Sequence, residues 1–89
     1  MALLQLEIQN LKGLHARASA KLAEVVEMFD ASATIRKDGM EADGDSIMGL
    51  LMLAATIGTS IEVETSGSQA NELATALTDL VNDKFGEDD

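Results

Sequence analysis

Hydrophobic and polar residues alternate with a period of two in several short segments of this chain, which is the pattern of strands that bury one face. Residues 4–8 alternate leucine and isoleucine with polar side chains, and residues 61–65 alternate apolar positions with glutamates. Residues 32–37 and 40–43 flank Asp38-Gly39, a dipeptide that favours a two-residue hairpin turn with positive φ at both positions. The pattern predicts four strands, of which the second and third form a hairpin.

Three other segments place their apolar residues at helical spacing. Residues 16–29 form the first, residues 47–53 form a shorter second with Ser46 as its N-cap, and residues 69–84 form the third, which we expect residues 66–68 to cap. The buried stripe predicted for the last helix comprises Leu73, Ala76, Leu77, Leu80 and Val81. Residues 84–89, which end in three acidic side chains, are expected to be a frayed acidic tail.

The predicted element order is therefore β-α-β-β-α-β-α within a single domain of residues 1–89. Strands with one apolar face fit an antiparallel sheet that helices cover on one side. We expect a two-layer α+β fold, an open-faced sandwich with three helices on one face of the sheet. Periodicity alone does not separate this arrangement from a ferredoxin-like one.

Composition narrows the classes of function. The chain has no cysteine, two aromatic residues and a formal net charge of −10. These features do not favour a nucleic-acid partner, which needs a broad basic surface or aromatic stacking platforms. The apolar run 47–57 is shorter than the roughly 20 residues of a membrane span, and the N-terminus lacks the pattern of a secretory signal. We expect a cytoplasmic monomer that does not insert into a membrane.

One window departs from this acidic background. Residues 13–21 read Gly-Leu-His-Ala-Arg-Ala-Ser-Ala-Lys and contain His15, the only histidine of the chain. Because Lys12, Arg17 and Lys21 are the only charged residues from position 8 to position 23, that stretch has a formal charge of +3. Alanine favours a helix and the glycine at the start of the window favours a loop, so His15 is expected at or next to a helix N-terminus.

This combination of residues suits a phosphoryl group. The first backbone N–H groups of a helix have no intrahelical acceptor, and they attract anions such as phosphate. Arg17 adds a planar, permanently charged group that matches phosphate oxygens. His15 adds a nucleophilic nitrogen whenever its ring is neutral. Taken singly, each side chain is as well explained as an ordinary solvated residue, and only the combination favours a phosphoryl site.

Residues 13–17, Gly-Leu-His-Ala-Arg, resemble the active-site motif of the HPr/NPr family, the small histidine-containing phosphocarriers of the bacterial phosphoenolpyruvate-dependent phosphotransferase system. Residues 45–51, Asp-Ser-Ile-Met-Gly-Leu-Leu, resemble the second motif of this family, a serine before an apolar helix, and the similarity covers nearly the full chain. The family usually has proline where this chain has Ala18. The resemblance implies a four-stranded antiparallel sheet of order 1-4-2-3.

The resemblance also implies functional roles. Nδ1 of His15 would accept a phosphoryl group from phosphorylated enzyme I and pass it to a IIA-type acceptor. Arg17 would stabilise the phosphate, and the backbone N–H groups of Ala16 and Arg17 would donate to its oxygens. No cofactor and no metal are expected, since the acidic residues between positions 38 and 45 lack the glycine and the terminal glutamate of a calcium loop. The chain is not expected to turn over a substrate on its own.

Ser46 and the apolar residues after it are a second candidate site. The resemblance implies that Ser46 is the target of an HPr kinase/phosphorylase. A serine at this position is also an ordinary N-cap. Ile47, Met48 and Leu51 would form an exposed patch that docks partners, whereas their spacing equally allows them to be core. A second class of function therefore stays open. It is a regulatory binding module, of a nitrogen-type branch or controlled by a Ser46 kinase, without obligatory phosphoryl transfer through His15.

Overall fold

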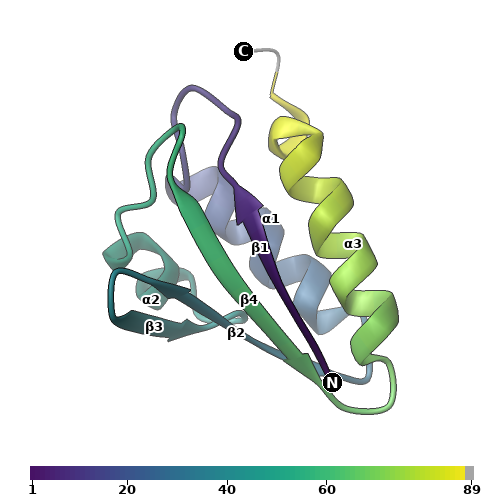
Figure 1. Cartoon of the computed structure of the whole chain (residues 1–89). Helices are drawn as coiled ribbons and strands as arrows, with labels where there is room; N and C mark the ends of the chain where they lie inside the picture. The colour runs from purple at the N-terminus through teal and green to yellow at the C-terminus, as the bar shows by residue number, and fades with distance from the viewer. Residues whose placement is uncertain (88–89) are drawn as a thin grey trace.

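A computed structural model describes residues 1–87 and contains the predicted elements in the predicted order (Figure 1). They are β1 (Ala2–Glu7), α1 (Ala16–Glu27), β2 (Ser32–Lys37), β3 (Met40–Asp43), α2 (Ile47–Met52), β4 (Ser60–Ser66) and α3 (Ala70–Asn82), followed by a single 3-10 turn, η1 (Lys84–Gly86). The hairpin strands have the predicted bounds because the Asp38-Gly39 turn has positive φ at both positions, 52° and 81°.

The four strands form one sheet in the order β1-β4-β2-β3, and all three pairings are antiparallel. Val63 of β4 lies opposite Leu4 of β1 on one side and Ile35 of β2 on the other, and Ile35 in turn lies opposite Ala42 of β3. The apolar positions of the four strands therefore share one face. This order confirms the expected α+β fold and excludes the ferredoxin-like alternative.

The helices cover the apolar face of the sheet, and the other face is open (Figure 1). The largest fully buried side chains between the two layers include Ile8, Leu22, Ile35, Leu50, Leu53, Ile61, Val63, Leu73, Leu77 and Val81. On the open face Arg36 lies within 3.1 Å of Glu41, Glu62 and Glu64, and these carboxylates raise the pKa of its guanidinium. The sheet thus separates an apolar core from an exposed ion-pair cluster.

Both long helices end earlier than the sequence pattern suggests. Helix α1 stops at Glu27, before the predicted position 29, and α3 runs from residue 70 to 82 instead of from 69 to 84. The predicted cap at residues 66–68 is wrong, because the hydroxyl of Ser68 donates to the backbone oxygen of Asp30 at 3.2 Å and makes no bond to the helix. Asp30 thereby ties the connection before α3 to the end of α1.

The expected frayed acidic tail is also wrong for residues 84–87. Phe85 is completely buried in the core, where burial of a large aromatic side chain contributes about 1.5–3 kcal/mol. The ammonium of Lys21 in α1 donates to the backbone oxygen of Phe85 at 2.6 Å. These two contacts hold residues 84–86 against the core and α1. The remaining two positions of the predicted tail, 88 and 89, lie outside the described residues.

The loop before α1 approaches another backbone segment closely at Gly13. The N–H of Leu14 donates to the oxygen of Ala55 at 2.9 Å, and the amide of Asn10 donates to the oxygen of Gly13 at 2.7 Å. Gly13 has a φ of +66°, and a Cβ atom there would overlap the Ala55 oxygen and lie 3.0 Å from Cα of Thr56. Only glycine tolerates both the positive φ and the lack of room for a Cβ atom. This contact therefore fixes the position at which the loop leads into α1.

We predict that Gly13→Ala lowers the free energy of unfolding by more than the roughly 1–2 kcal/mol that the left-handed backbone alone costs. The added loss comes from the overlap with the backbone around Ala55. Gly39→Ala is the matched control, because Gly39 also has positive φ, +81°, but no atom lies within 4 Å of its Cβ position. Urea denaturation measures both variants, and equal losses would contradict the assigned contact.

Candidate functional site

His15 is the N-cap residue of α1. Its backbone is extended, with φ −77° and ψ −175°, and its oxygen accepts the first helical hydrogen bond from the N–H of Ser19 at 2.8 Å. The hydroxyl of Ser19 is buried and donates to the oxygen of Leu14 at 3.1 Å, which ties the helix back to the loop. The predicted position of His15 at a helix N-terminus is therefore confirmed. Ala18 lies in the first turn and is fully buried, so alanine suits this position.

The first turn of α1 has groups that can bind an anion. Within residues 1–87 the backbone N–H groups of Ala16, Arg17 and Ala18 donate to no acceptor, and the His15 side chain forms no cap hydrogen bond with them. Ala16 and Arg17 are exposed, and the guanidinium of Arg17 has no hydrogen-bond or ion-pair partner in the described chain. This end of the helix is thus open to a small tetrahedral anion.

The sequence analysis did not predict the carboxylate that contacts the imidazole. The carboxylate of Glu87, seventy-two positions away in sequence, forms a hydrogen-bonded pair with Nε2 of His15. Its second oxygen accepts from the amide of Asn10 at 3.0 Å. The loop after β1 and the end of α3 lie at the same end of the molecule, which brings the two segments together (Figure 1). The apolar spacing of Leu77, Val81 and Phe85 indicates that the stripe of α3 continues towards the tail.

The pair is partly buried, because 27% of the His15 side chain and 11% of the Glu87 side chain are exposed. The hydrogen bond with His15 is the main cause of a lowered pKa of Glu87, and the Asn10 amide and the charge of Lys12 lower it further, against the opposing effect of burial. Glu87 is therefore a carboxylate at neutral pH. Within residues 1–87, the fold thus brings one carboxylate, that of Glu87, into contact with the histidine of the acid-free window.

The three basic residues of the window have different surroundings. Lys21 is partly buried and holds the tail through its bond to Phe85, whereas Lys12 and Arg17 are exposed. Two basic residues elsewhere, Arg36 and Lys37, are paired with carboxylates of the sheet and hairpin. Arg17, exposed on the first turn of α1, is therefore available to an anion at the helix start.

Ser46 has the structural role that its sequence position allows. Its hydroxyl accepts from the backbone N–H of Gly49 at 3.1 Å, so it is the N-cap of α2. Leu50 is fully buried, whereas Ile47, Met48 and Leu51 are 42%, 73% and 37% exposed. The exposure expected of these three side chains is therefore present. Other large apolar side chains, among them Leu11, Met52 and Ile57, are exposed as well.

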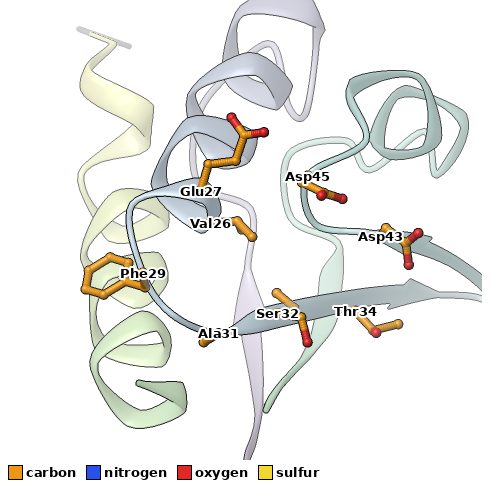
Figure 2. Close-up of a pocket in the computed structure, with 9 residues that line it drawn as sticks. Val26, Glu27, Phe29, Ala31, Ser32, Thr34, Asp43 and Asp45 are labelled. Carbon is orange, nitrogen blue, oxygen red and sulfur yellow. The ribbon is translucent and has the colours of Figure 1, made fainter. Parts of the chain in front are cut away.

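A hollow elsewhere on the molecule has a different character. It lies at the other end of α1, between Val26 and Phe29 and the strands of the hairpin, and its acidic residues are Glu27, Asp43 and Asp45 (Figure 2). No basic side chain lines it, so it does not suit a phosphate. Among residues 1–87 no group of three potential metal ligands is placed to hold an ion, and no helix there has the length and apolar character of a membrane span.

Comparison with known proteins places this site in a family. Residues 4–83 match the model of the PTS HPr component phosphorylation site. The chain is 49% identical over 82 residues to phosphocarrier protein HPr of Neisseria meningitidis, with 92% of each protein covered. It is 45% identical over 83 residues to phosphocarrier protein NPr of Escherichia coli, again with 92% of each covered.

Solved structures agree with the sequence relatives. HPr-C-His from Thermoanaerobacter tengcongensis superposes with a TM-score of 0.94 at 33% identity, with 99% of each chain covered. HPr from Bacillus anthracis gives a TM-score of 0.85 at 34% identity, with 90% of this chain and 95% of that chain covered. With a histidine at the open start of α1, a matching family model and these relatives, the chain belongs to the HPr/NPr family of phosphocarrier proteins of the phosphotransferase system.

Proposed function

We propose that this phosphocarrier accepts a phosphoryl group on His15 from phosphorylated enzyme I and passes it to a IIA-type acceptor. The observation that carries the proposal is the position of the ring, a partly exposed histidine at the N-cap of α1 beside backbone N–H groups without acceptors in the described chain. Membership of the phosphocarrier family supports the same role. We include a cytoplasmic location in the proposal, because the donor and acceptors implied by the family act there.

Nδ1 is the ring nitrogen that we assign to the reaction. Nε2 is paired with the carboxylate of Glu87, while Nδ1 has no hydrogen bond within residues 1–87. A neutral imidazole has one N–H and one lone pair, so a hydrogen bond donated by Nε2 leaves the lone pair on Nδ1. Attack by Nδ1 forms a new N–P bond as the N–P bond in the donor breaks.

Arg17 is assigned to the phosphoryl group after transfer. Its guanidinium is exposed on the first turn of α1, and the adjacent N–H groups of Ala16 and Arg17 can donate to phosphate oxygens. A carrier has to release the group again, so binding it moderately serves better than a deep, closed pocket. The site suits moderate binding, because the ring at this helix end is partly exposed.

A second candidate function is a switch at Ser46. The N-cap position brings a phosphate on this serine to the start of α2, next to the exposed side chains of Ile47 and Met48. A phosphate adds nearly two negative charges to a surface that would otherwise offer apolar contacts. Phosphorylation by an HPr kinase/phosphorylase would then change which partners dock while α2 stays folded. In this function Ile47, Met48 and Leu51 form the docking surface.

We predict that phosphoenolpyruvate labelled on its phosphorus, together with enzyme I, places acid-labile label on the wild-type chain and none on His15→Ala. Phosphohistidine is the only product expected at this site, because the chain has one histidine. Ser46→Ala is the control and should take up label like the wild type. Label that persists on His15→Ala would refute the assignment of the phosphoryl site.

We predict that Arg17→Ala keeps the fold but slows phosphoryl transfer on the order of 10²-fold, the usual loss when one charge-stabilising donor is removed. The side chain is exposed, so far-UV circular dichroism and melting temperature should stay close to those of the wild type. Arg36→Ala, which changes the other arginine of the chain, should leave rapid-quench transfer rates unchanged. Equal rates in both variants would remove Arg17 from the mechanism.

We predict that Ser46→Asp weakens binding to enzyme I, because it adds a negative charge beside the exposed apolar patch. Aspartate and asparagine are both good N-caps, so Ser46→Asp and Ser46→Asn should be similarly stable. Asparagine adds no charge and serves as the matched control. Isothermal titration calorimetry of each variant with enzyme I measures the effect, and equal affinities of the two variants would count against the switch.

A further inference from the structure

We propose that Glu87 is a positioning residue for His15, which holds the ring in the tautomer with a proton on Nε2 and stabilises the positive charge that the ring gains when Nδ1 is phosphorylated. This inference deepens the proposed phosphocarrier function and rests on it. Its structural basis is the pair between the Glu87 carboxylate and Nε2 of His15, a contact between residues 72 positions apart in sequence.

The loop before α1 holds the carboxylate in place. The Asn10 side chain is completely buried, and its amide nitrogen donates both to the oxygen of Gly13 at 2.7 Å and to Glu87 at 3.0 Å. Both partners are acceptors, so the NH₂ group of Asn10 and not its oxygen has to face them. One buried side chain thus links the loop that delivers His15 to the carboxylate that contacts the ring.

The tail that carries Glu87 is anchored independently of this contact. Phe85 is buried in the core, and its backbone oxygen accepts from the ammonium of Lys21. The N–H groups of Gly86 and Glu87 donate to the oxygens of Asp83 and Lys84, each at 2.9 Å. A folded turn therefore holds the carboxylate next to His15. Replacing the Glu87 side chain should leave this turn in place.

The chemistry of the pair decides which nitrogen carries the proton. The lowered pKa of Glu87 means that the group is a carboxylate, which accepts hydrogen bonds and cannot donate. Its partner nitrogen, Nε2, has to be the donor, and in the neutral ring Nδ1 then has the lone pair. The carboxylate selects the nucleophilic tautomer, as the orienting acid does for histidine in other catalytic arrangements.

The same contact suits both directions of transfer. When Nδ1 attacks, the Nδ1–P bond forms, the N–P bond of the donor breaks, and its electron pair returns to the donor nitrogen. The ring then carries a substituent on Nδ1 and a proton on Nε2, and its positive charge lies next to the carboxylate. When the group leaves for the acceptor, the electron pair of the Nδ1–P bond returns to Nδ1. No proton has to move at any stage.

The charged groups near the ring can be placed from their contacts. Lys12 acts on the Glu87 carboxylate, Lys21 is bound to the tail, and Arg17 is exposed on the first turn of α1. Within residues 1–87, the carboxylate that contacts the ring does so at Nε2. Nε2 and Nδ1 point to different sides of the imidazole. The negative charge can therefore stabilise the imidazolium without standing in the path of the phosphoryl group.

Two substitutions of Glu87 separate its effect on the ring tautomer from the effect of its negative charge. Glu87→Ala removes the acceptor, whereas Glu87→Gln keeps an oxygen that can accept from Nε2 but removes the negative charge. Glu72→Gln removes an exposed carboxylate of α3 and is the matched control. Circular dichroism and thermal melting confirm that each variant is folded. Because the chain has one histidine, ring ¹⁵N signals report on His15 alone.

The first readout is the ring tautomer of the unphosphorylated protein, measured by ¹⁵N NMR about two pH units above the usual imidazole pKa of about 6.5, so that the ring is neutral. We expect the proton on Nε2 in the wild type, in Glu87→Gln and in Glu72→Gln. In Glu87→Ala we expect a several-fold fall in the ratio of the Nε2–H to the Nδ1–H form. An unchanged ratio in Glu87→Ala would overturn the proposal.

The second readout is the rate of phosphoryl transfer from enzyme I. Loss of the carboxylate partner of a metal-bound histidine typically costs on the order of 10–100-fold in activity. We expect a loss of this size in both Glu87→Ala and Glu87→Gln but not in Glu72→Gln. Rates in both Glu87 variants equal to the control would also overturn the proposal. Label on His15→Ala would instead refute the phosphocarrier site, while the tautomer measurement, which needs no phosphate, would still test the contact.

Discussion

The close approach of the Gly13 loop to the backbone at Ala55 is the constraint on which the functional site depends. It joins the entry to α1 with the segment that follows α2, through the Leu14 N–H bond to the Ala55 oxygen. The contact leaves no room for a side chain on Gly13, so the loop has one path, and that path ends with His15 at the N-cap. The contact thereby links the position of His15 to the segment that follows α2.

The electrostatics of the site differ from those of the rest of the molecule. The chain is strongly acidic, and the open face of the sheet gathers carboxylates around Arg36, yet the start of α1 has exposed Arg17 and backbone donors without acceptors in residues 1–87. Among the described residues, the carboxylate of Glu87 does reach the site, and it contacts the ring at Nε2. A phosphoryl group at Nδ1 would therefore lie away from this carboxylate, which contacts the other nitrogen of the ring.

Much of the architecture could be predicted from local patterns. The hairpin strands and the N-cap of α2 appear where expected, because Asp38-Gly39 and Ser46 act through local backbone geometry. The order of the strands could not be obtained in this way, since alternation shows which face is buried but not which strand is the neighbour; it came from the family resemblance. The predicted cap of α3 at residues 66–68 was wrong because the hydroxyl of Ser68 bonds to Asp30, a tertiary partner that competes with the helix.

The sequence by itself determined that a lone histidine would stand at the start of a helix among basic residues, because helix propensity, glycine and local charge are properties of adjacent positions. Only the tertiary structure decided that a carboxylate would reach the same ring. The tail resembles a solvated acidic end until Phe85 is seen to enter the core, and the burial of that side chain is an interaction with the whole fold. Contacts between residues far apart in sequence depend on packing, and no local pattern specifies them.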